Sequence, residues 1–441
     1  MEILELTDNI RKSVILLNKE HDNFDPVIDL VGNSRFVLLG EATHGSKEFY
    51  EIRAAISRRL IKEKGFAAIA VEADFPDTHR INQFIKGSGS DTQAIDSLGE
   101  FKRFPRWMWR NTEMVKFVDF LRKYNSELPL ELRIGFYGLD LYSMYASIHA
   151  VISYLDKVDP DAANKAKKRY ECFEQYGKEE DSYGIAMSYI NKSCQQAAVT
   201  QLKELYNNKF QMLNKNPLEK EELFFAQQNA RLAKNAEQYY REMFSGKTNT
   251  WNLRDQHMAE ILEQISNHLE KNYGSGKVIV WAHNSHIGDA RATDMKLEGE
   301  LNLGQIIREK YHQNSFLIGF TTNNGTVSAA SFWGGDVERK NIHLALHGSY
   351  EDLFRHVGDY FLLNLKKLPD NLNELKIPRL QRAIGVIYRP QSERISHYFF
   401  ANIADQFDAV IHINTTNALE PLDNSHLWTS GEIPQTYKSG L

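Results

Sequence analysis

The pattern of apolar and polar residues divides this chain into three stretches. In residues 1–141, short apolar runs alternate with segments in which apolar residues recur every three or four positions. Short runs are typical of buried strands, and the longer period is typical of amphipathic helices. Residues 142–245 contain no strand-like run, and residues 246–441 return to the first pattern. We therefore expect a discontinuous α/β core, residues 1–141 and 246–441, and a helical insertion subdomain, residues 142–245.

The first stretch predicts a β-α-β unit near the N-terminus. The apolar run Phe36–Leu39 comes before a helical pattern over Lys47–Lys64, and a second apolar run, Ala67–Val71, follows. A strand-helix-strand connection of this length places its strands parallel, as neighbours or nearly so. The expected fold class is α/β, with a mainly parallel or mixed central sheet flanked by helices and a long all-helical insertion.

The same patterns predict the remaining elements of the core. Thr250 is the expected N-cap of a long helix over 251–273. The other expected helices cover 3–20, a short segment from Asp25-Pro26, 76–86, 113–124 and 303–311. The other expected strands cover 133–137, 277–282, 316–320, 327–330, 383–388 and 409–413.

Composition and charge narrow the class of protein without changing this fold. A chain of 441 residues exceeds the size at which a single core stops growing, which agrees with a core plus an insertion. The net charge of -5 argues against nucleic-acid binding, because nucleic-acid-binding domains are usually basic. No apolar run reaches the ~18 residues of a membrane-spanning helix, so we expect no membrane partner.

The two cysteines, Cys172 and Cys194, lie in the helical stretch. Neither has the neighbouring Cys or His of a zinc site, so we expect free thiols in a reducing compartment. The N-terminal residues Met1–Leu6 are acidic where a secretory signal would be basic. Together these features predict a cytoplasmic protein.

Acidic and histidine side chains follow the predicted strands at their carboxyl ends. Ligands of open α/β sheets bind at this edge, and several such groups from separate strands indicate a shared site. Glu41 and His44, three positions apart in one strand-to-helix turn, form its expected centre. The full set is Glu41, His44, Glu72, Asp140, His283 and His286.

Three common catalytic motifs are missing from the sequence. There is no G-x-S-x-G nucleophile elbow and no G-x-G-x-x-G dinucleotide fingerprint. The stretch Gly274–Lys277 lacks the full spacing of a phosphate loop, and it precedes a strand instead of following one. Nucleophilic-serine, nucleotide and nicotinamide chemistry are therefore disfavoured.

Ordered motifs extend over nearly the whole chain. They are Gly40–Gly45, Val71–Asp74, Trp107–Trp109, Asn252–Asp255, Trp281–His286 and Phe332–Gly335. In these motifs the chain resembles the erythromycin esterase family, some of whose members are named succinoglycan biosynthesis protein. The resemblance implies hydrolysis of a lactone or other carboxylic ester by a histidine-activated water, with no covalent serine intermediate and no cofactor.

The resemblance also implies roles for individual residues. A neutral imidazole can take a proton from water while Glu41 or Glu72 holds its tautomer. Positively charged or N–H donors such as Arg53, His283 or His286 would stabilise the resulting oxyanion. By motif position, His44 corresponds to the proposed general base, and Glu41, Arg53, Glu72, His283 and His286 correspond to the other active-site positions.

Aromatic and charged residues elsewhere are candidates for substrate contacts, because tryptophan and arginine together often rim a cleft. These candidates are Trp107, Trp109, Asp140, Arg254 and Trp333. Two arginines, Arg254 and Arg53, also have a purely structural interpretation. Arg254 could belong to a salt-bridged helix start, and Arg53 could pair on its helix with Glu48 or Glu51.

Two other interpretations stay open. Three histidines with nearby glutamates also make a ligand set for a divalent metal, and the spacing of His283 and His286 suits one helical turn. A non-catalytic protein acting in polysaccharide assembly would keep the fold without turnover. The sequence predicts a small-molecule ester or lactone as the partner, but it predicts neither the particular substrate nor the oligomeric state.

Overall fold

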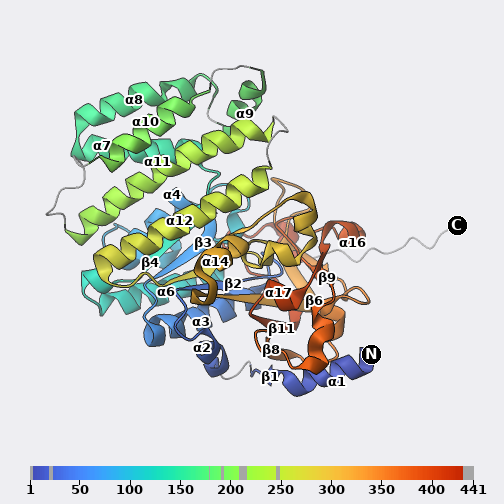
Figure 1. Cartoon of the computed structure of the whole chain (residues 1–441). Helices are drawn as coiled ribbons and strands as arrows, with labels where there is room; N and C mark the ends of the chain where they lie inside the picture. The colour runs from blue at the N-terminus through green and yellow to red at the C-terminus, as the bar shows by residue number, and fades with distance from the viewer. Residues whose placement is uncertain are drawn as a thin grey trace.

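The computed structural model describes residues 3–18, 23–177, 179–189, 193–207, 216–244 and 249–430. Within them, one large mixed sheet has helices on both faces (Figure 1). Its strands are β1 (Ile15–Leu16), β2 (Phe36–Leu39), β3 (Ala68–Asp74), β4 (Gly135–Asp140), β5 (Val278–Trp281), β6 (Ser315–Ala329), β7 (Glu338–Ile342), β8 (Tyr360–Asn364) and β11 (Ala409–Thr416). The order across the sheet is β1-β8-β11-β6-β2-β5-β3-β4, and β7 pairs with β6 outside this path.

The centre of the sheet is parallel and its margins are antiparallel. All pairings from β4 to β11 are parallel, whereas β1, β7 and β8 pair antiparallel with their neighbours. In β2, Val37 and Leu39 face one hydrophobic core, and Phe36 and Leu38 face the other. Burial on both faces explains why the central strands are uninterrupted apolar runs. The predicted fold class is confirmed, and β2 and β3 are parallel with β5 between them.

Amphipathic helices cover both faces because each presents one apolar stripe to the sheet. One core includes residues of α2 (Asp25–Val31), α3 (Lys47–Lys64) and α6 (Thr112–Ser126). The other includes residues of α1 (Ile3–Ser13), α12 (Thr250–Tyr273) and α14 (Leu303–Tyr311). Helix α4 (Phe75–Lys86) follows β3 directly and contacts α6 and β4.

A further layer of helices lies beyond α12, away from the sheet (Figure 1). It consists of α7 (Met144–Val158), α8 (Pro160–Glu174), α9 (Glu180–Tyr189), α10 (Gln195–Tyr206) and α11 (Pro217–Met243). Helix α11 packs against α7, α9, α10 and α12, so it joins this layer to the core. The predicted domain boundary at residues 245 and 246 lies outside the described residues, and the division into core and subdomain stays a prediction.

The remaining elements are short. The helices are α5 (Ala94–Ser97), α13 (Asn284–Ile287), α15 (Tyr350–Phe354), α16 (Glu393–Ser396), α17 (Ile403–Gln406) and α18 (His426–Ser430). Turns of 3-10 helix cover Arg106–Met108, Leu130–Leu132, Ala290–Ala292, Asp294–Glu298, His312–Asn314, Asp370–Lys376 and Pro390–Ser392. Strands β9 (Arg379–Arg382) and β10 (Tyr398–Ala401) form a separate antiparallel pair.

The structure corrects three element boundaries. The first helix ends at Ser13, and the chain then enters β1; residues 19–20 of the predicted helix lie outside the described residues. The N-cap of α12 is Asn249, whose side chain accepts the N–H of Asn252, rather than Thr250. The two strands predicted at 316–320 and 327–330 are the single strand β6.

The strand predicted at residues 383–388 is wrong. These residues make only isolated bridges, between Thr43 and Ile384 and between Ala330 and Ile387. Their apolar side chains are instead packed: Ile384 and Tyr388 are fully buried beside the end of β6. An apolar run therefore marks burial here without a sheet ladder.

The prediction of two free thiols is also wrong. Cys172 on α8 and Cys194, which precedes α10, form a disulfide with Cα atoms 5.9 Å apart. Their separation of 22 residues along the chain carries no local sign of this pairing, because the packing of α8 against α10 creates it. The inference of a reducing compartment from free thiols therefore loses its basis. Within the described residues, no helix is both long enough and apolar enough to cross a bilayer.

Candidate active site

The turn after β2 and the helix α3 that follows it place an imidazole, a carboxylate and a guanidinium in a row. His44 Nδ1 lies 2.8 Å from Glu41 Oε1, and Arg53 Nη2 lies 2.7 Å from Glu41 Oε2. Glu41 and Arg53 have no exposed surface, and His44 is 7% exposed. Because Glu41 accepts the Nδ1 proton, Nε2 of a neutral His44 keeps its lone pair.

Close backbone packing fixes this turn. A Cβ atom at Gly45 would lie 1.9 Å from the carbonyl oxygen of Ser328 in β6, so only glycine fits without displacement. The N–H of His44 donates to the carbonyl of Ile384, at 3.2 Å, and the Tyr50 hydroxyl donates to the carbonyl of His44, at 3.0 Å. The 383–388 segment, which was predicted as a strand, therefore serves to hold the turn.

Glu72, at the end of β3, connects the other strand ends. Its Oε2 accepts the backbone N–H of His283 at 2.8 Å, and its Oε1 accepts Arg254 Nη2 at 2.8 Å. Burial alone would raise the pKa of Glu72, but its electrostatic interactions with His286, His44 and Arg254 outweigh burial and hold that pKa well below its usual range. Glu72 is therefore an ionised carboxylate at the centre of the strand ends.

His283, which follows β5, is a neutral imidazole. Its ring centroid lies 4.9 Å from that of His44. Its Nδ1 accepts the Ser285 N–H at 3.2 Å and lies 2.8 Å from the Ser285 hydroxyl oxygen. Burial and the neighbouring His44 lower the pKa of His283 to about 3. Since Nδ1 accepts, Nε2 carries the proton and is the donor.

His286, on the short helix α13, has the opposite electrostatic environment. Its Nδ1 lies 2.9 and 3.0 Å from the two carboxylate oxygens of Asp255, and its Nε2 lies 3.3 Å from Glu72 Oε1. Burial opposes the charged ring and Arg254 adds to that effect, yet Asp255 and Glu72 prevail and raise the pKa of His286 to about 9. Trp251 stacks on this ring, with centroids 4.4 Å apart and planes 8° from parallel.

Arg254 ties α12 to the sheet edge. Its Nε and Nη2 donate to the two oxygens of Asp140, at 3.0 and 2.6 Å, and its Nη1 lies 3.0 Å from His286 Nε2. This bidentate pair fixes the guanidinium plane beside Glu72. Arg254 is therefore salt-bridged at the start of its helix, as the structural alternative stated, and because its partners come from β3 and β4 it also lines the cleft.

These groups line a cleft of about 370 Å³ at the carboxyl edge of the sheet. Of the predicted residues, the cleft brings together His44, Glu72, Asp140, Arg254, His283, His286, Trp109 and Trp333. Trp333 is 67% exposed and meets Phe104 edge to face, with ring centroids 5.0 Å apart, at the rim. The exposed indole gives the cleft an aromatic margin.

Three predicted residues do not line the cleft. Arg53 and Glu41 lie behind His44, and Trp107 is buried in the hydrophobic core. Arg53 pairs with neither helix neighbour that was considered, since Glu51 pairs with Lys47 and Glu48 binds Asn417. The position of Arg53 connects it to Glu41 rather than to a bound substrate.

The sequence did not assign three residues of this site: Trp251, Asp255 and Ser285. Asp255 lies next to Arg254 along the chain, and the run Asn252–Asp255 was recognised only as a motif. Helical geometry would have placed Trp251 and Asp255 one turn apart on the same face. No sequence signal identified the strand end that this face contacts.

Within the part of the chain that the structure describes, no group of three or more His, Cys, Asp or Glu is arranged to hold a metal ion. Nδ1 of each of the three histidines is already engaged, by Glu41, by Ser285 and by Asp255. Metal-bound histidines also have one ring nitrogen engaged in this way, so the argument against a metal rests on the arrangement of these groups and not on their Nδ1 partners.

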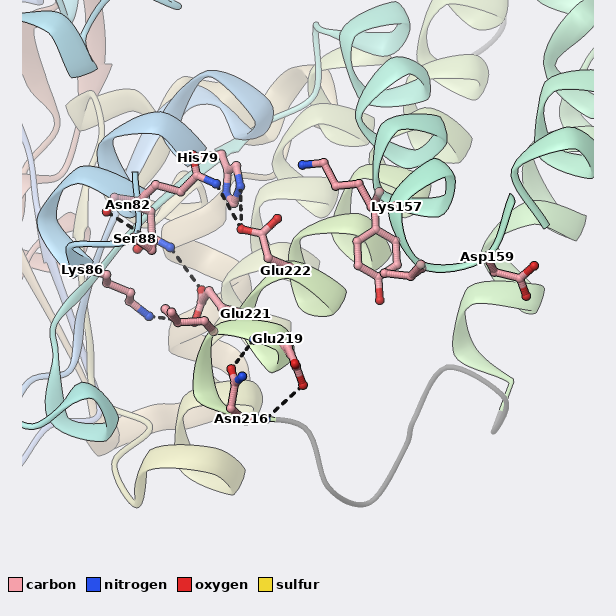
Figure 2. A pocket seen from close by; sticks show the side chains of 14 residues that line it. His79, Asn82, Lys86, Ser88, Lys157, Asp159, Asn216, Glu219, Glu221 and Glu222 are labelled. Atoms are coloured by element: carbon pink, nitrogen blue, oxygen red, sulfur yellow. Dashed lines mark hydrogen bonds and ion pairs between the residues drawn. The ribbon is translucent and has the colours of Figure 1, made fainter. Parts of the chain in front are cut away.

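A larger cavity, of about 700 Å³, lies between α4, α7 and α11 (Figure 2). Two ion pairs lie in its lining: Lys86 Nζ is 2.7 Å from Glu221 Oε2, and His79 Nε2 is 3.2 Å from Glu222 Oε1. None of its lining residues belongs to the strand-end cluster. We therefore place the active site in the smaller cleft, on the basis of chemistry and not of volume.

Fold and site together define an α/β protein with histidine-carboxylate pairs at the carboxyl edge of a mixed sheet. The family model described as erythromycin esterase matches residues 61–416, and the chain belongs to this family. The matched span begins after Glu41, His44 and Arg53, so their place in the site rests on the geometry above. The fold-class and family predictions are both confirmed.

Individual relatives agree with this membership. The chain is 24% identical over 435 residues to erythromycin esterase type II of Escherichia coli, which covers 92% of this chain and 96% of the relative. A succinoglycan biosynthesis protein has a similar fold, with a TM-score of 0.77 and 21% identity, over 95% of this chain and 98% of that one. An erythromycin esterase mutant in its open conformation is similar over 91% and 95% of the two chains, with a TM-score of 0.64 and 17% identity.

Proposed function

We propose that this protein hydrolyses a lactone or another carboxylic ester with a water activated by His44, without a covalent serine intermediate. The observation that carries the proposal is the contact between His44 Nδ1 and Glu41, at 2.8 Å, on a histidine that lines the cleft. Membership of the erythromycin esterase family supports an ester bond as the target. A macrolide lactone is one candidate substrate among others.

In this mechanism, His44 Nε2 takes a proton from water as the oxygen attacks the ester carbonyl. The Nδ1–H of the resulting imidazolium remains bound to Glu41, whose other carboxylate oxygen lies 2.7 Å from Arg53 Nη2. An ionised partner stabilises the charge that develops on the ring, which lowers the barrier to proton transfer. The proton then passes to the leaving alkoxide.

The attack also places a negative charge on the former carbonyl oxygen. Two side chains with N–H groups face the cleft from the turn after β5, His283 and His286. Preorganised donors of this kind typically contribute ~10²- to 10³-fold to the rate. The lining aromatics Trp109 and Trp333 would contact the apolar part of the ester, and the cleft residues would set which ester fits.

A panel of macrolides, simple lactones and aryl esters tests the proposal. We expect wild type to cleave at least one member, and His44→Ala to lower kcat/KM by about 10²- to 10⁴-fold, the usual contribution of a general base. His347→Ala is the matched control, because His347 pairs with Asp352 outside the cleft and its side chain is 89% exposed. No turnover by wild type, or equal turnover by wild type and His44→Ala, would contradict the proposal and favour a non-catalytic role.

Two further measurements separate the mechanism from its rivals. Intact mass spectrometry during turnover should show no acyl adduct, and Ser285→Ala should retain most of the activity. Elemental analysis, with activity before and after chelation, should show activity that does not follow metal content. A trapped acyl-Ser285, or stoichiometric metal with activity lost to the chelator, would replace His44-activated water by serine or metal chemistry.

A further inference from the structure

Two residues that line the cleft, Phe104 and Trp333, contact each other although they belong to distant segments of the chain. Their rings meet edge to face, with centroids 5.0 Å apart. Edge-to-face pairs attract each other beyond the apolar area that they bury. The contact is therefore a specific link between two segments, and the anchoring of each segment determines what the link spans.

Trp333 lies at the tip of the hairpin that joins β6 to β7, and the two strands pair up to the base of this loop. The Gly335 N–H donates to the carbonyl of Phe332 at 3.0 Å, so Trp333 and Gly334 are the central residues of a tight turn. Gly334 has a φ of 79°, as the third position of a type II turn requires. The indole is 67% exposed, so the hairpin presents it to the cleft and not to the core.

Phe104 is held on the other side of the cleft by contacts of Arg103, the residue before it. Arg103 Nη1 lies 3.0 Å from Asp74 Oδ2, at the end of β3. The guanidinium also lies over the ring of Tyr142, which follows β4, at 5.6 Å from the centroid. These contacts fix the backbone at Phe104 relative to the β3 edge of the sheet.

The link crosses the strand ends that carry the catalytic groups. In the sheet, β2 and β5 lie between β6 and β3. His44 follows β2 and His283 follows β5, and both line the same cleft as the aromatic pair. Neighbouring strands are ~4.8 Å apart, so three spacings separate β6 from β3 by about 14 Å. Side chains that meet from the two sides of such a gap form a bridge across the cleft.

We propose that this bridge of Phe104 and Trp333 limits the size of the ester, so that a slim ester reaches His44 beneath it and a bulky one is excluded. The inference rests on the proposed hydrolysis and narrows its substrates to slim, apolar esters; a macrocyclic lactone falls on the excluded side. Phe101 and Val386 add apolar surface to the cleft. The cleft volume of about 370 Å³ lies near the lower end of the range for ligand sites, which agrees with a slim substrate.

Two aryl esters with the same leaving group test the size limit. One carries a butyryl chain, and the other carries the same chain with an adamantyl group at its far end, so both have the same reactive carbonyl. We expect wild type to prefer the slim ester by ~10-fold or more in kcat/KM, the discrimination typical of an apolar site. Trp333→Ala should reduce this preference by about 10-fold, because the bulky ester is then admitted.

A double variant separates a bridge from two independent contacts. Phe104→Ala should relax the preference as Trp333→Ala does, and the double variant should relax it no further, because the bridge is lost with either partner. Trp333→Phe keeps an aromatic ring and should retain part of the preference. Phe332→Ala is the control, since Phe332 is 60% exposed on the same hairpin and does not line the cleft.

The same comparison can be made without turnover. Ketone analogues of the two esters, with a CH₂ group in place of the leaving-group oxygen, bind without being cleaved, and calorimetry gives their Kd for each variant. A failure of hydrolysis therefore leaves the size limit measurable. An equal Kd or kcat/KM for the slim and bulky compounds in wild type, an unchanged preference in Trp333→Ala, or additive effects in the double variant would overturn the inference.

Discussion

Glu41 lies between His44 and Arg53, and this arrangement determines how Arg53 can act. The guanidinium lies over the rings of Tyr50 and Trp281, at 4.6 and 4.9 Å from their centroids, and among the described residues its ion pair is with Glu41. A buried cation packed between aromatic faces and a carboxylate is fixed in one geometry. Arg53 therefore acts on His44 through Glu41, as an electrostatic support for the base.

A double-mutant cycle tests this relay. Arg53→Met should lower the free energy of unfolding by about 3–5 kcal/mol, because it leaves a carboxylate buried without its partner. In a Glu41→Gln background the same change should cost much less in stability and little more in kcat/KM. Urea unfolding measures the stability, and turnover assays measure kcat/KM, for wild type, the two single variants and the double variant. Arg58→Met on the same helix is the control. Equal losses of kcat/KM in both backgrounds would instead mean that Arg53 meets the substrate directly.

Among individual site residues, the sequence predicted those that follow a strand and missed those that reach the strand end from a helix. Glu41, Glu72 and His283 stand directly after apolar runs, so the strand pattern alone places them at one edge. Asp255 and Trp251 reach the same edge from the start of α12. Their contacts depend on how α12 packs across the sheet, which no local pattern encodes.

Among the elements, the turn between β2 and α3 is the part least tolerant of change. Gly45→Ala should displace the turn, because the new Cβ would meet the carbonyl of Ser328 at 1.9 Å. Overpacking of this kind typically costs about 1–3 kcal/mol. We expect a lower urea midpoint together with reduced turnover, since His44 precedes Gly45. Gly385→Ala, where a Cβ has no heavy atom within 4 Å, is the control for stability, and equal midpoints would show that the turn can yield.

Elements with strong and uniform patterns were predicted well. The helix Lys47–Lys64 was predicted to the residue, because its apolar spacing is regular and Gly65 ends it in the left-handed conformation. Strand β6 was predicted as two because polar Asn323, Asn324 and Gly325 interrupt its apolar run. The strand continues through them because its later part pairs with β7. Tertiary pairing thus overrode a local break.

For the molecule as a whole, buried histidines should make the fold sensitive to acid. Burial lowers the pKa of His257 and His397 to about 4 and that of His412 to about 3, from an ordinary value near 6.5. In this range the unfolded chain binds protons that the native protein does not, so stability is full above pH 6.5 and falls as the pH drops. Each such histidine contributes about 1.4 kcal/mol per pH unit to the slope.

His412 isolates one of these contributions. It is fully buried, its Nδ1 contacts the hydroxyl of Thr321 at 2.9 Å, and it does not line the active-site cleft. His412→Gln should reduce the dependence of the unfolding free energy on pH by about 1.4 kcal/mol per pH unit between pH 6 and 4. Urea titrations across this range measure it. His347→Gln, with an 89% exposed side chain, is the surface control, and a slope in His412→Gln equal to that of wild type would contradict the assignment.

The fold class was predictable because alternating strand and helix periods over the core leave few arrangements of a parallel sheet. The link between Cys172 and Cys194 was not predictable, because it depends on the packing of two inserted helices. The strand order was also beyond the sequence: β5 inserts between β2 and β3 from more than 200 residues away. The order of the strands and the pairing of the cysteines depend on which buried surfaces pack together, and a local pattern does not specify this.

Helix α12 contacts both the sheet edge and the outer layer of helices, and this limits how members of such a family can diverge. Its first turns supply Trp251, Arg254 and Asp255 to the cleft, while its length packs against α11 in the outer layer. Recombination that exchanges α7–α11 can bring in a new outer layer and keep the charge network intact. Exchange that includes α12 replaces half of that network at once. A chimaera that takes its outer helices from a relative should therefore be joined before Thr250 and not after Tyr273.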